Sequence, residues 1–284
     1  GHLDIGDRVA TISNNRPEWN VIDLATAMAG MVHVPIYPTI SIEEFRYIII
    51  HANVKILFVS DGNLYRKLSC LIEEINNLQA IYCFNHSKSG PNWLDMMTEK
   101  SSLSSAQDLE QRMSKIQPTD LFTLIYTSGT TGKPKGVMLS HQNILCNMHA
   151  VVNIFPMEAG DRALSILPLC HITERLVNYL YQFTGVKIFY AKGFDTILSD
   201  LRDSRAQGFV AVPRVLEKIL EKIVENSKSL KPQHRWIFNW AVFQAERFEE
   251  HPSKQKAKRL ARSDKRVFIH WRKALGGPKK FIAC

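Results

Sequence analysis

The chain has 284 residues, of which 45% are hydrophobic, and a formal net charge of +9 at pH 7. This size and composition are sufficient for a hydrophobic core in one large domain or two subdomains. No apolar run reaches the ~20 residues of a membrane-spanning helix, and the first residues lack the apolar centre of a signal peptide, so we expect a cytoplasmic protein.

Strands and helices alternate through the first 84 residues. The predicted strands cover 8–13, 32–37, 55–60 and 80–84, and the predicted helices cover 17–29, 41–52 and 63–76. This spacing is typical of βαβ units and predicts an α/β fold with mostly parallel sheets flanked by helices. The polar stretch 85–117 is predicted to be a surface excursion between subdomains.

A polar loop lies between two short apolar runs in the segment from Thr123 to His141. The run at 124–127 predicts a strand, the run at 136–139 predicts another, and Ser140 is placed to cap a following helix. We therefore predict the order strand, loop, strand, helix.

The composition of this loop is typical of an anion site. Its glycines can take positive φ and turn successive backbone N–H groups toward one anion. Its hydroxyl groups donate hydrogen bonds, and its lysines carry charge that suits a polyphosphate. The candidate residues of this phosphate loop are Thr127, Ser128, Gly129, Thr130, Thr131, Gly132, Lys133, Lys135 and Gly136.

Two other phosphate-binding motifs do not fit the loop. The second glycine of a Walker A motif would fall on Pro134 or Val137. The second glycine of a dinucleotide-binding G-x-G-x-x-G would fall on Thr131. An ordinary hairpin turn is the remaining alternative, but such a turn needs neither so many polar residues nor two lysines.

The alternation resumes after the loop and then becomes helical. We predict helices at 141–154, 171–183 and 196–205 and strands at 162–167, 187–191 and 208–212. From residue 213 onward the pattern is helical up to about residue 275, and a new strand begins at residue 281.

The cysteines and histidines indicate no metal centre. The five cysteines are widely spaced and include no C-x-x-C pair, so we interpret them as reduced core thiols. They are Cys70, Cys83, Cys146, Cys170 and Cys284. The ten histidines are scattered along the chain.

The run YTSGTTGKPKG from Tyr126 to Gly136 resembles the phosphate loop of the AMP-forming acyl-adenylating superfamily. Other stretches resemble its long-chain fatty acyl-CoA synthetase branch, in the order of that family. They are SNNRPEW at 13–19, VPIYPT at 34–39, LPLCHITER at 167–175, VPRVLEK at 212–218 and ALGG at 274–277.

The resemblance covers nearly the whole chain and implies the N-terminal domain of the acyl-adenylating fold. Residues 1–117 would be its first α/β part, and residues 118–284 would be the loop hairpin plus a second α/β part. The family's adenine motif, its ribose-binding aspartate and its small C-terminal catalytic domain would follow Cys284. We therefore expect a truncated domain that is inactive alone.

The resemblance also implies an activity for the parent protein. ATP and a fatty acid would give an acyl-adenylate, and coenzyme A would then give acyl-CoA. Thr127 is implied as a Mg²⁺ ligand and His171 as a residue of the acyl site. Some long-chain members carry an aromatic gate where this chain has Arg175. Glu174 and Arg175 could pair with each other or be solvated.

Two other functions stay open at this stage. An enzyme of the same superfamily with another carboxylic acid as substrate would share the phosphate loop. A non-catalytic nucleotide-binding module could also derive from such an enzyme.

The positive charge is concentrated between Arg247 and Lys280. This segment holds twelve basic and three acidic residues, which gives +9, so the rest of the chain is neutral. A solvated face is the usual interpretation of such a run. The alternative is attraction to the phosphates of coenzyme A or to anionic lipid, as a peripheral contact at the inner face of a membrane. Nucleic-acid binding is disfavoured because no matching motif accompanies the charge.

Overall fold

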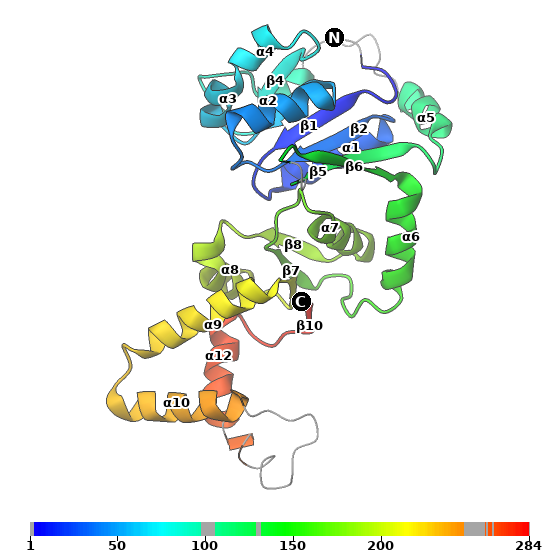
Figure 1. Cartoon of the computed structure of the whole chain (residues 1–284). Helices are drawn as coiled ribbons and strands as arrows, with labels where there is room; N and C mark the ends of the chain where they lie inside the picture. The colour runs from blue at the N-terminus through cyan, green and yellow to red at the C-terminus, as the bar shows by residue number, and fades with distance from the viewer. Residues whose placement is uncertain are drawn as a thin grey trace. The chain divides into compact units, whose positions relative to one another are not determined.

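The computed structural model describes residues 3–97, 106–128, 132–246, 259, 261–262 and 264–283. The chain divides into two compact units. Unit 1 contains Gly1–Phe155 and Pro168–Tyr179, and unit 2 contains Pro156–Leu167 and Leu180–Cys284. Each unit has its own sheet (Figure 1).

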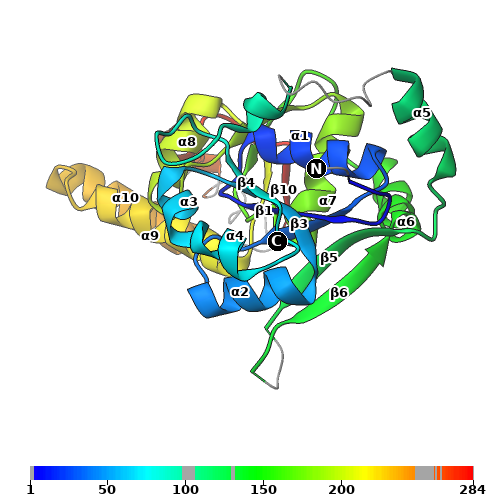
Figure 2. The same cartoon turned by 90° about the horizontal axis from the view of Figure 1, so that it is seen from above.

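The sheet of unit 1 has the strand order β4-β3-β1-β2-β5-β6 among the described residues. Its strands are β1 (Arg8–Ile12), β2 (Val32–Ile36), β3 (Val54–Val59), β4 (Ala80–Cys83), β5 (Leu121–Thr127) and β6 (Lys135–Ser140). Neighbouring strands are parallel except β5 and β6, which form an antiparallel hairpin at one edge (Figure 2). The two predicted strands and the helix that follows them are therefore confirmed.

Three of the described helices of unit 1, those that begin at residues 42, 62 and 141, have a side-chain cap at the start. The helices of this unit are α1 (Pro17–Met28), α2 (Ile42–His51), α3 (Gly62–Leu68), α4 (Cys70–Glu74), α5 (Ala106–Lys115), α6 (His141–Val152) and the first turns of α7 (Ile172–Thr184). The Ser41 hydroxyl accepts from the Glu44 N–H at 3.2 Å, and the Glu44 carboxylate accepts from the Ser41 N–H at 3.0 Å. This capping box satisfies two backbone donors at the start of α2.

The core of unit 1 lies between its sheet and the helices. Val34, Phe45, Ile49 and Leu57 are almost completely buried and belong to one hydrophobic cluster. The polar stretch 85–117 contains more structure than predicted, namely the short 3-10 helix η1 (Trp93–Met97) and α5. The predicted division at residue 117 separates the hairpin from this unit, whereas β5 pairs with β2 inside it.

The prediction that the cysteines are core thiols is wrong for two of them. Cys83 and Cys170 are buried, but Cys70 and Cys146 are exposed. Cys70 begins the short helix α4, and Cys146 lies on the outer side of α6, so neither is needed to fill the core. Cys284 lies outside the described residues.

Unit 2 has a smaller sheet with the order β10-β9-β7-β8 in the part of the chain that the structure describes. Its strands are all parallel: β7 (Arg162–Ser165), β8 (Lys187–Tyr190), β9 (Gly208–Val210) and β10 (Phe281–Ala283). The helical elements that follow are η2 (Phe194–Thr196), α8 (Ile197–Ser204), α9 (Pro213–Ser227), α10 (Pro232–Glu246), η3 (Asp264–Phe268) and α12 (Ile269–Ala274).

The helical end of unit 2 has its own small core. Phe238, Ala241 and Val267 are buried there, with Trp240 and Trp271 packed against them. The α/β class with mostly parallel sheets and a helical C-terminal part is therefore confirmed. Residues 247–258 of the basic segment lie outside the described residues.

Candidate functional site

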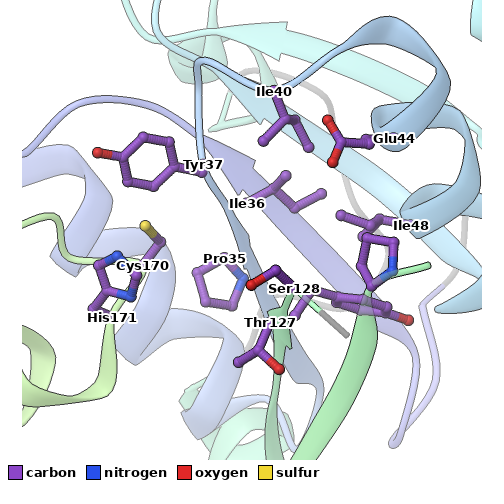
Figure 3. A pocket seen from close by; sticks show the side chains of 12 residues that line it. Pro35, Ile36, Tyr37, Ile40, Glu44, Ile48, Thr127, Ser128, Cys170 and His171 are labelled. Carbon is purple, nitrogen blue, oxygen red and sulfur yellow. The ribbon is translucent and has the colours of Figure 1, made fainter. Parts of the chain in front are cut away.

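A pocket of about 150 Å³ lies in unit 1, where β2 and β5 end (Figure 3). Parallel sheets place ligand sites at the carboxyl ends of their strands, because the loops that follow carry polar groups to one edge. The pocket is lined by Pro35, Ile36, Tyr37, Ile40, Glu44, Ile48, Tyr126, Thr127, Ser128, Pro134, Cys170 and His171. Three separate segments therefore meet here: the end of β2 with α2, the hairpin, and the start of α7.

One wall of the pocket is apolar and comes from β2 and α2. Ile36, Ile40 and Ile48 supply it, and Glu44 adds a carboxylate beside them (Figure 3). That carboxylate accepts the Ser41 N–H, so it is held in place by the first turn of α2. This wall suits a small group with an apolar part more than a highly charged one.

His171 forms the opposite wall, directly before α7. Its side chain is exposed, and its ring centroid lies 5.9 Å from that of Tyr37 at an interplanar angle of 50°. Cys170 beside it is buried, and burial raises the pKa of its thiol to about 12. At neutral pH Cys170 is therefore a neutral packing group, and His171 is the polar side chain that faces the pocket from this segment.

The ends of the phosphate loop lie on the hairpin. Thr127 and Ser128 are exposed and line the pocket. Gly132 has φ of +85°, as expected for a glycine-dependent turn, and Lys133 is exposed. Gly129, Thr130 and Thr131 lie outside the described residues.

The hairpin register explains where the remaining loop residues lie. Lys135 is paired with Thr127 across the two strands, and Gly136 is paired with Tyr126. A Cβ atom at Gly136 would lie 3.2 Å from Cζ of the Tyr126 ring, so glycine lets this ring lie across the hairpin. The structure thus brings Thr127, Ser128 and His171 to one pocket, with Lys135 at the adjacent hairpin position.

Tyr126 also contacts His51 of α2, a residue that the sequence analysis did not identify. Nδ1 of His51 lies 2.6 Å from the phenolic oxygen of Tyr126, and burial raises the pKa of this phenol to about 12. The phenol is therefore protonated at neutral pH and can donate to the imidazole. Tyr37 could have been found from the sequence because it is the last residue of a predicted buried strand.

The Glu174 and Arg175 side chains are both buried, and neither lines the pocket. The Arg175 guanidinium pairs with Asp23 of α1, and Glu174 accepts a hydrogen bond from Asn178 at 3.2 Å. The question left open by the sequence is answered: Arg175 pairs with a distant aspartate and not with its neighbour. Its side chain also does not occupy the place of a gate at this pocket.

Comparison with known families gives one decisive match, since the AMP-binding enzyme family covers residues 2–263 of the chain. The chain belongs to the AMP-binding enzyme family. Curated relatives of this AMP-binding enzyme include the long-chain-fatty-acid–CoA ligase FadD15 of Mycobacterium bovis, 32% identical over 79% of this chain and 38% of the relative. Another is fatty acyl-CoA synthetase A of Dictyostelium discoideum, 31% identical over 99% of this chain and 42% of the relative.

Solved structures agree with the fold of this AMP-binding enzyme. The N-terminal domain of FACL13 from Mycobacterium tuberculosis aligns with a TM-score of 0.57 and 21% identity, over 75% of this chain and 52% of that one. MatB from Rhodopseudomonas palustris aligns with a TM-score of 0.61 and 24% identity, over 77% of this chain and 42% of that one. The chain spans about two fifths of the length of the curated relatives named above. Among its described helices, none combines the length and apolar character needed to cross a membrane.

Proposed function

We propose that this AMP-binding enzyme chain belongs to a ligase that activates a long-chain fatty acid. The acid and ATP give an acyl-adenylate and pyrophosphate, and coenzyme A then displaces AMP to give acyl-CoA. The observation that carries this proposal is the single pocket that contains Thr127 and Ser128 of the phosphate loop together with His171. The printed activities of the curated relatives support it.

In the first step, a carboxylate oxygen of the fatty acid attacks the α-phosphorus of ATP. The bond from this phosphorus to the bridging oxygen breaks, and that oxygen leaves with pyrophosphate. The protein contributes by positioning the reactants and by stabilising the charge on the leaving group. Hydroxyl groups of Thr127 and Ser128 and the ammonium groups of Lys133 and Lys135 suit this second task.

The residues at the pocket also fit a magnesium ion. Mg²⁺ takes oxygen ligands and is usually bound through few protein groups, water and substrate phosphates. Thr127 offers an exposed hydroxyl oxygen in the pocket, and we assign it as the protein ligand. The ion would neutralise charge on the phosphate oxygens.

His171 and the isoleucine wall would hold the carboxyl end of the acid. The pocket of about 150 Å³ is smaller than the ~300 Å³ of a typical small-molecule site. We therefore assign it to the reacting groups and not to the whole acyl chain. Arg175 lies outside the pocket, so acyl-chain selection at this position would not use an aromatic gate.

The basic segment from Arg247 to Lys280 has two open roles in this proposal. It is either a solvated face or a contact for phosphates, those of coenzyme A or those of an anionic lipid at the inner face of a membrane. A salt-dependent Michaelis constant for coenzyme A and sedimentation with anionic vesicles would separate these roles. We place the parent protein in the cytoplasm in either case.

Pyrophosphate release with ATP, Mg²⁺ and palmitate tests the main proposal. We expect turnover by the full-length protein and none by the 284-residue chain, because the chain spans only about two fifths of the relatives named above. Lys135→Ala should lower the rate of the full-length protein, whereas Lys187→Ala on β8, also an exposed lysine, should not.

Preference for an aryl or short-chain acid would favour an enzyme of the same family with another carboxylic acid as substrate. ATP binding by the full-length protein without release would favour a non-catalytic nucleotide-binding module.

A further inference from the structure

A network of six polar side chains is buried in unit 1, on the amino-terminal side of the pocket along β2 and β5. The exposed fraction of each of these residues is 7% or less. The members of this Asp23–Arg175 network are Thr11, Asp23, His33, Thr123, Arg175 and Tyr179. None of them lines the pocket.

The carboxylate of Asp23 is the centre of the network. It accepts hydrogen bonds from Nε of Arg175 at 3.0 Å, from Nη2 of the same residue, and from the Tyr179 hydroxyl. Nδ1 of His33 lies 2.8 Å away from it. Asp23 therefore connects α1 to both α7 and β2.

The network has no net charge, because the Asp23 carboxylate is balanced by the Arg175 guanidinium and the other members are neutral. Burial would raise the pKa of Asp23, but Arg175 and His33 outweigh it and hold this pKa well below its usual range. Burial lowers the pKa of His33 despite the neighbouring carboxylate. The imidazole is therefore neutral, so we assign its Nδ1–H as a donor to Asp23, and its Nε2 accepts from the Thr11 hydroxyl at 2.9 Å.

The network also joins the three segments that form the pocket. Nη1 of Arg175 donates to the Thr123 hydroxyl at 2.7 Å, and that hydroxyl donates to the His33 carbonyl at 2.7 Å. His33 is two residues before Pro35 on β2, and Thr123 is three residues before Tyr126 on β5. Each strand that enters the pocket is therefore linked to Arg175 two or three residues upstream of its first pocket residue.

Arg175 is connected to the third segment through its backbone. Its N–H donates to the His171 carbonyl at 3.2 Å, which closes the first turn of α7. The guanidinium and the His171 ring, which lies against Tyr37, therefore belong to residues of the same helical turn. The guanidinium carbon also lies 4.7 Å from the centroid of the Phe122 ring, which limits its sideways movement.

We propose that the Asp23–Arg175 ion pair is a positioning element that sets His171 against the ends of β2 and β5. A buried ion pair seldom adds net stability over apolar residues of similar volume, because the cost of desolvation offsets the attraction. Five elements of unit 1 nevertheless contribute donors and acceptors to the network around this pair. We therefore assign the pair a role in orientation and not in stability: it would hold the strands and the helix that form the pocket walls in their relative positions.

The proposal rests on the proposed adenylation chemistry only for its kinetic test. In the full-length protein, Arg175→Met leaves the Asp23 carboxylate without its cation, and Asp23→Asn with Arg175→Met removes both charges. We expect the double variant to recover most of the melting temperature lost by Arg175→Met. Its kcat for pyrophosphate release should stay about tenfold or more below wild type, because the walls are no longer aligned. Arg175→Lys keeps the positive charge but lacks the planar guanidinium with its several donors. Its kcat should fall between that of wild type and that of the double variant.

A matched control and a second measurement make the test independent of folding and of the reaction. The control replaces an exposed ion pair of the same unit, Arg46→Ala with Glu74→Ala, and should change neither value appreciably. The second measurement is the NMR signal of the His171 ring, assigned by its loss in His171→Gln. It should move in both Arg175→Met variants and not in the control.

Two results would overturn the positioning role. One is a double variant whose kcat recovers together with its melting temperature, and the other is an unchanged His171 signal in both Arg175→Met variants. If the wild-type protein releases no pyrophosphate, the proposed function fails, and the NMR measurement alone decides the positioning role.

Discussion

Nδ1 of His51 and the phenolic oxygen of Tyr126 lie 2.6 Å apart and connect α2 to the end of β5, directly before the phosphate loop. The His51 ring also stacks on Tyr47 with a centroid distance of 5.3 Å. Nζ of Lys133 lies 5.7 Å from the Tyr47 ring centroid. The two ends of the loop therefore contact the same face of α2.

Tyr126→Phe should lower the free energy of unfolding by about 1 kcal/mol, because it removes one net hydrogen bond and leaves the ring in place. Chemical denaturation at pH 7 measures this difference. Tyr65→Phe is the matched control, since Tyr65 is also partly buried and its hydroxyl forms no hydrogen bond within the described residues. Equal losses in the two variants would show that the contact with His51 contributes nothing.

The helices and the hairpin could be predicted because their determinants are local. Ser41 with Glu44 and Ser140 with Asn143 form capping boxes that can be read three residues apart. The alternation of buried strands and helices predicted parallel pairing for the same reason. Thr127, Ser128 and His171 could be selected as site residues from motifs, and the structure brings these three to one pocket.

The interior of the site could not be predicted, since it depends on pairs that are distant in sequence. Asp23 and Arg175 are 152 residues apart. The sequence around each of them contains no pattern that indicates a buried charge. An arginine after a glutamate on a predicted helix is usually solvated or paired locally. Only the tertiary contact of α1 with α7 determines that Arg175 turns inward. The roles of the site residues stay predictions.

The buried histidine should make the stability of the protein depend on pH. His33 has a lowered pKa in the folded state, so below the unfolded value of about 6.5 the unfolded chain binds a proton that the folded chain does not. The contribution of the neutral His33 side chain to the free energy of unfolding is therefore complete above pH ~6.5. It is lost as the pH falls, by at most ~1.4 kcal/mol per pH unit. His141, also with a lowered pKa, acts in the same direction.

Urea denaturation between pH 7.5 and pH 5.5 measures this dependence. His33→Gln should reduce the slope of the unfolding free energy against pH, whatever its effect on absolute stability. His149→Gln, at an exposed position on α6, should keep the wild-type slope. A wild-type slope in His33→Gln would exclude His33 as a source of the pH dependence.

The left-handed conformation of Gly132 should make the hairpin sensitive to substitution there. Its φ is +85°, and no atom of the described residues beyond its chain neighbours lies within 4 Å of an added Cβ, so the expected cost of Gly132→Ala is backbone strain, about 1 kcal/mol. Gly193→Ala is the control, because Gly193 has extended backbone and equally open surroundings. We expect the control to change stability by less than about 0.5 kcal/mol. Similar losses in both variants would contradict a specific requirement for glycine at position 132.

The cysteines of unit 1 should differ strongly in reactivity. The thiolate is the reactive form, and it must be reached by the reagent. Cys70 and Cys146 are exposed, whereas burial raises the pKa of the Cys83 and Cys170 thiols, the latter to about 12. Brief treatment with iodoacetamide at pH 8 should therefore alkylate Cys70 and Cys146 first.

Peptide mapping by mass spectrometry distinguishes these four sites, and the same treatment in urea should label all of them. The result for Cys170 is the most informative, because this residue forms part of the pocket wall beside His171. Labelling of Cys170 as fast as Cys146 would mean that the start of α7 leaves the sheet under native conditions. Arg175→Met should raise the labelling rate of Cys170 and leave that of Cys146 unchanged, since the guanidinium holds the first turn of α7 in place.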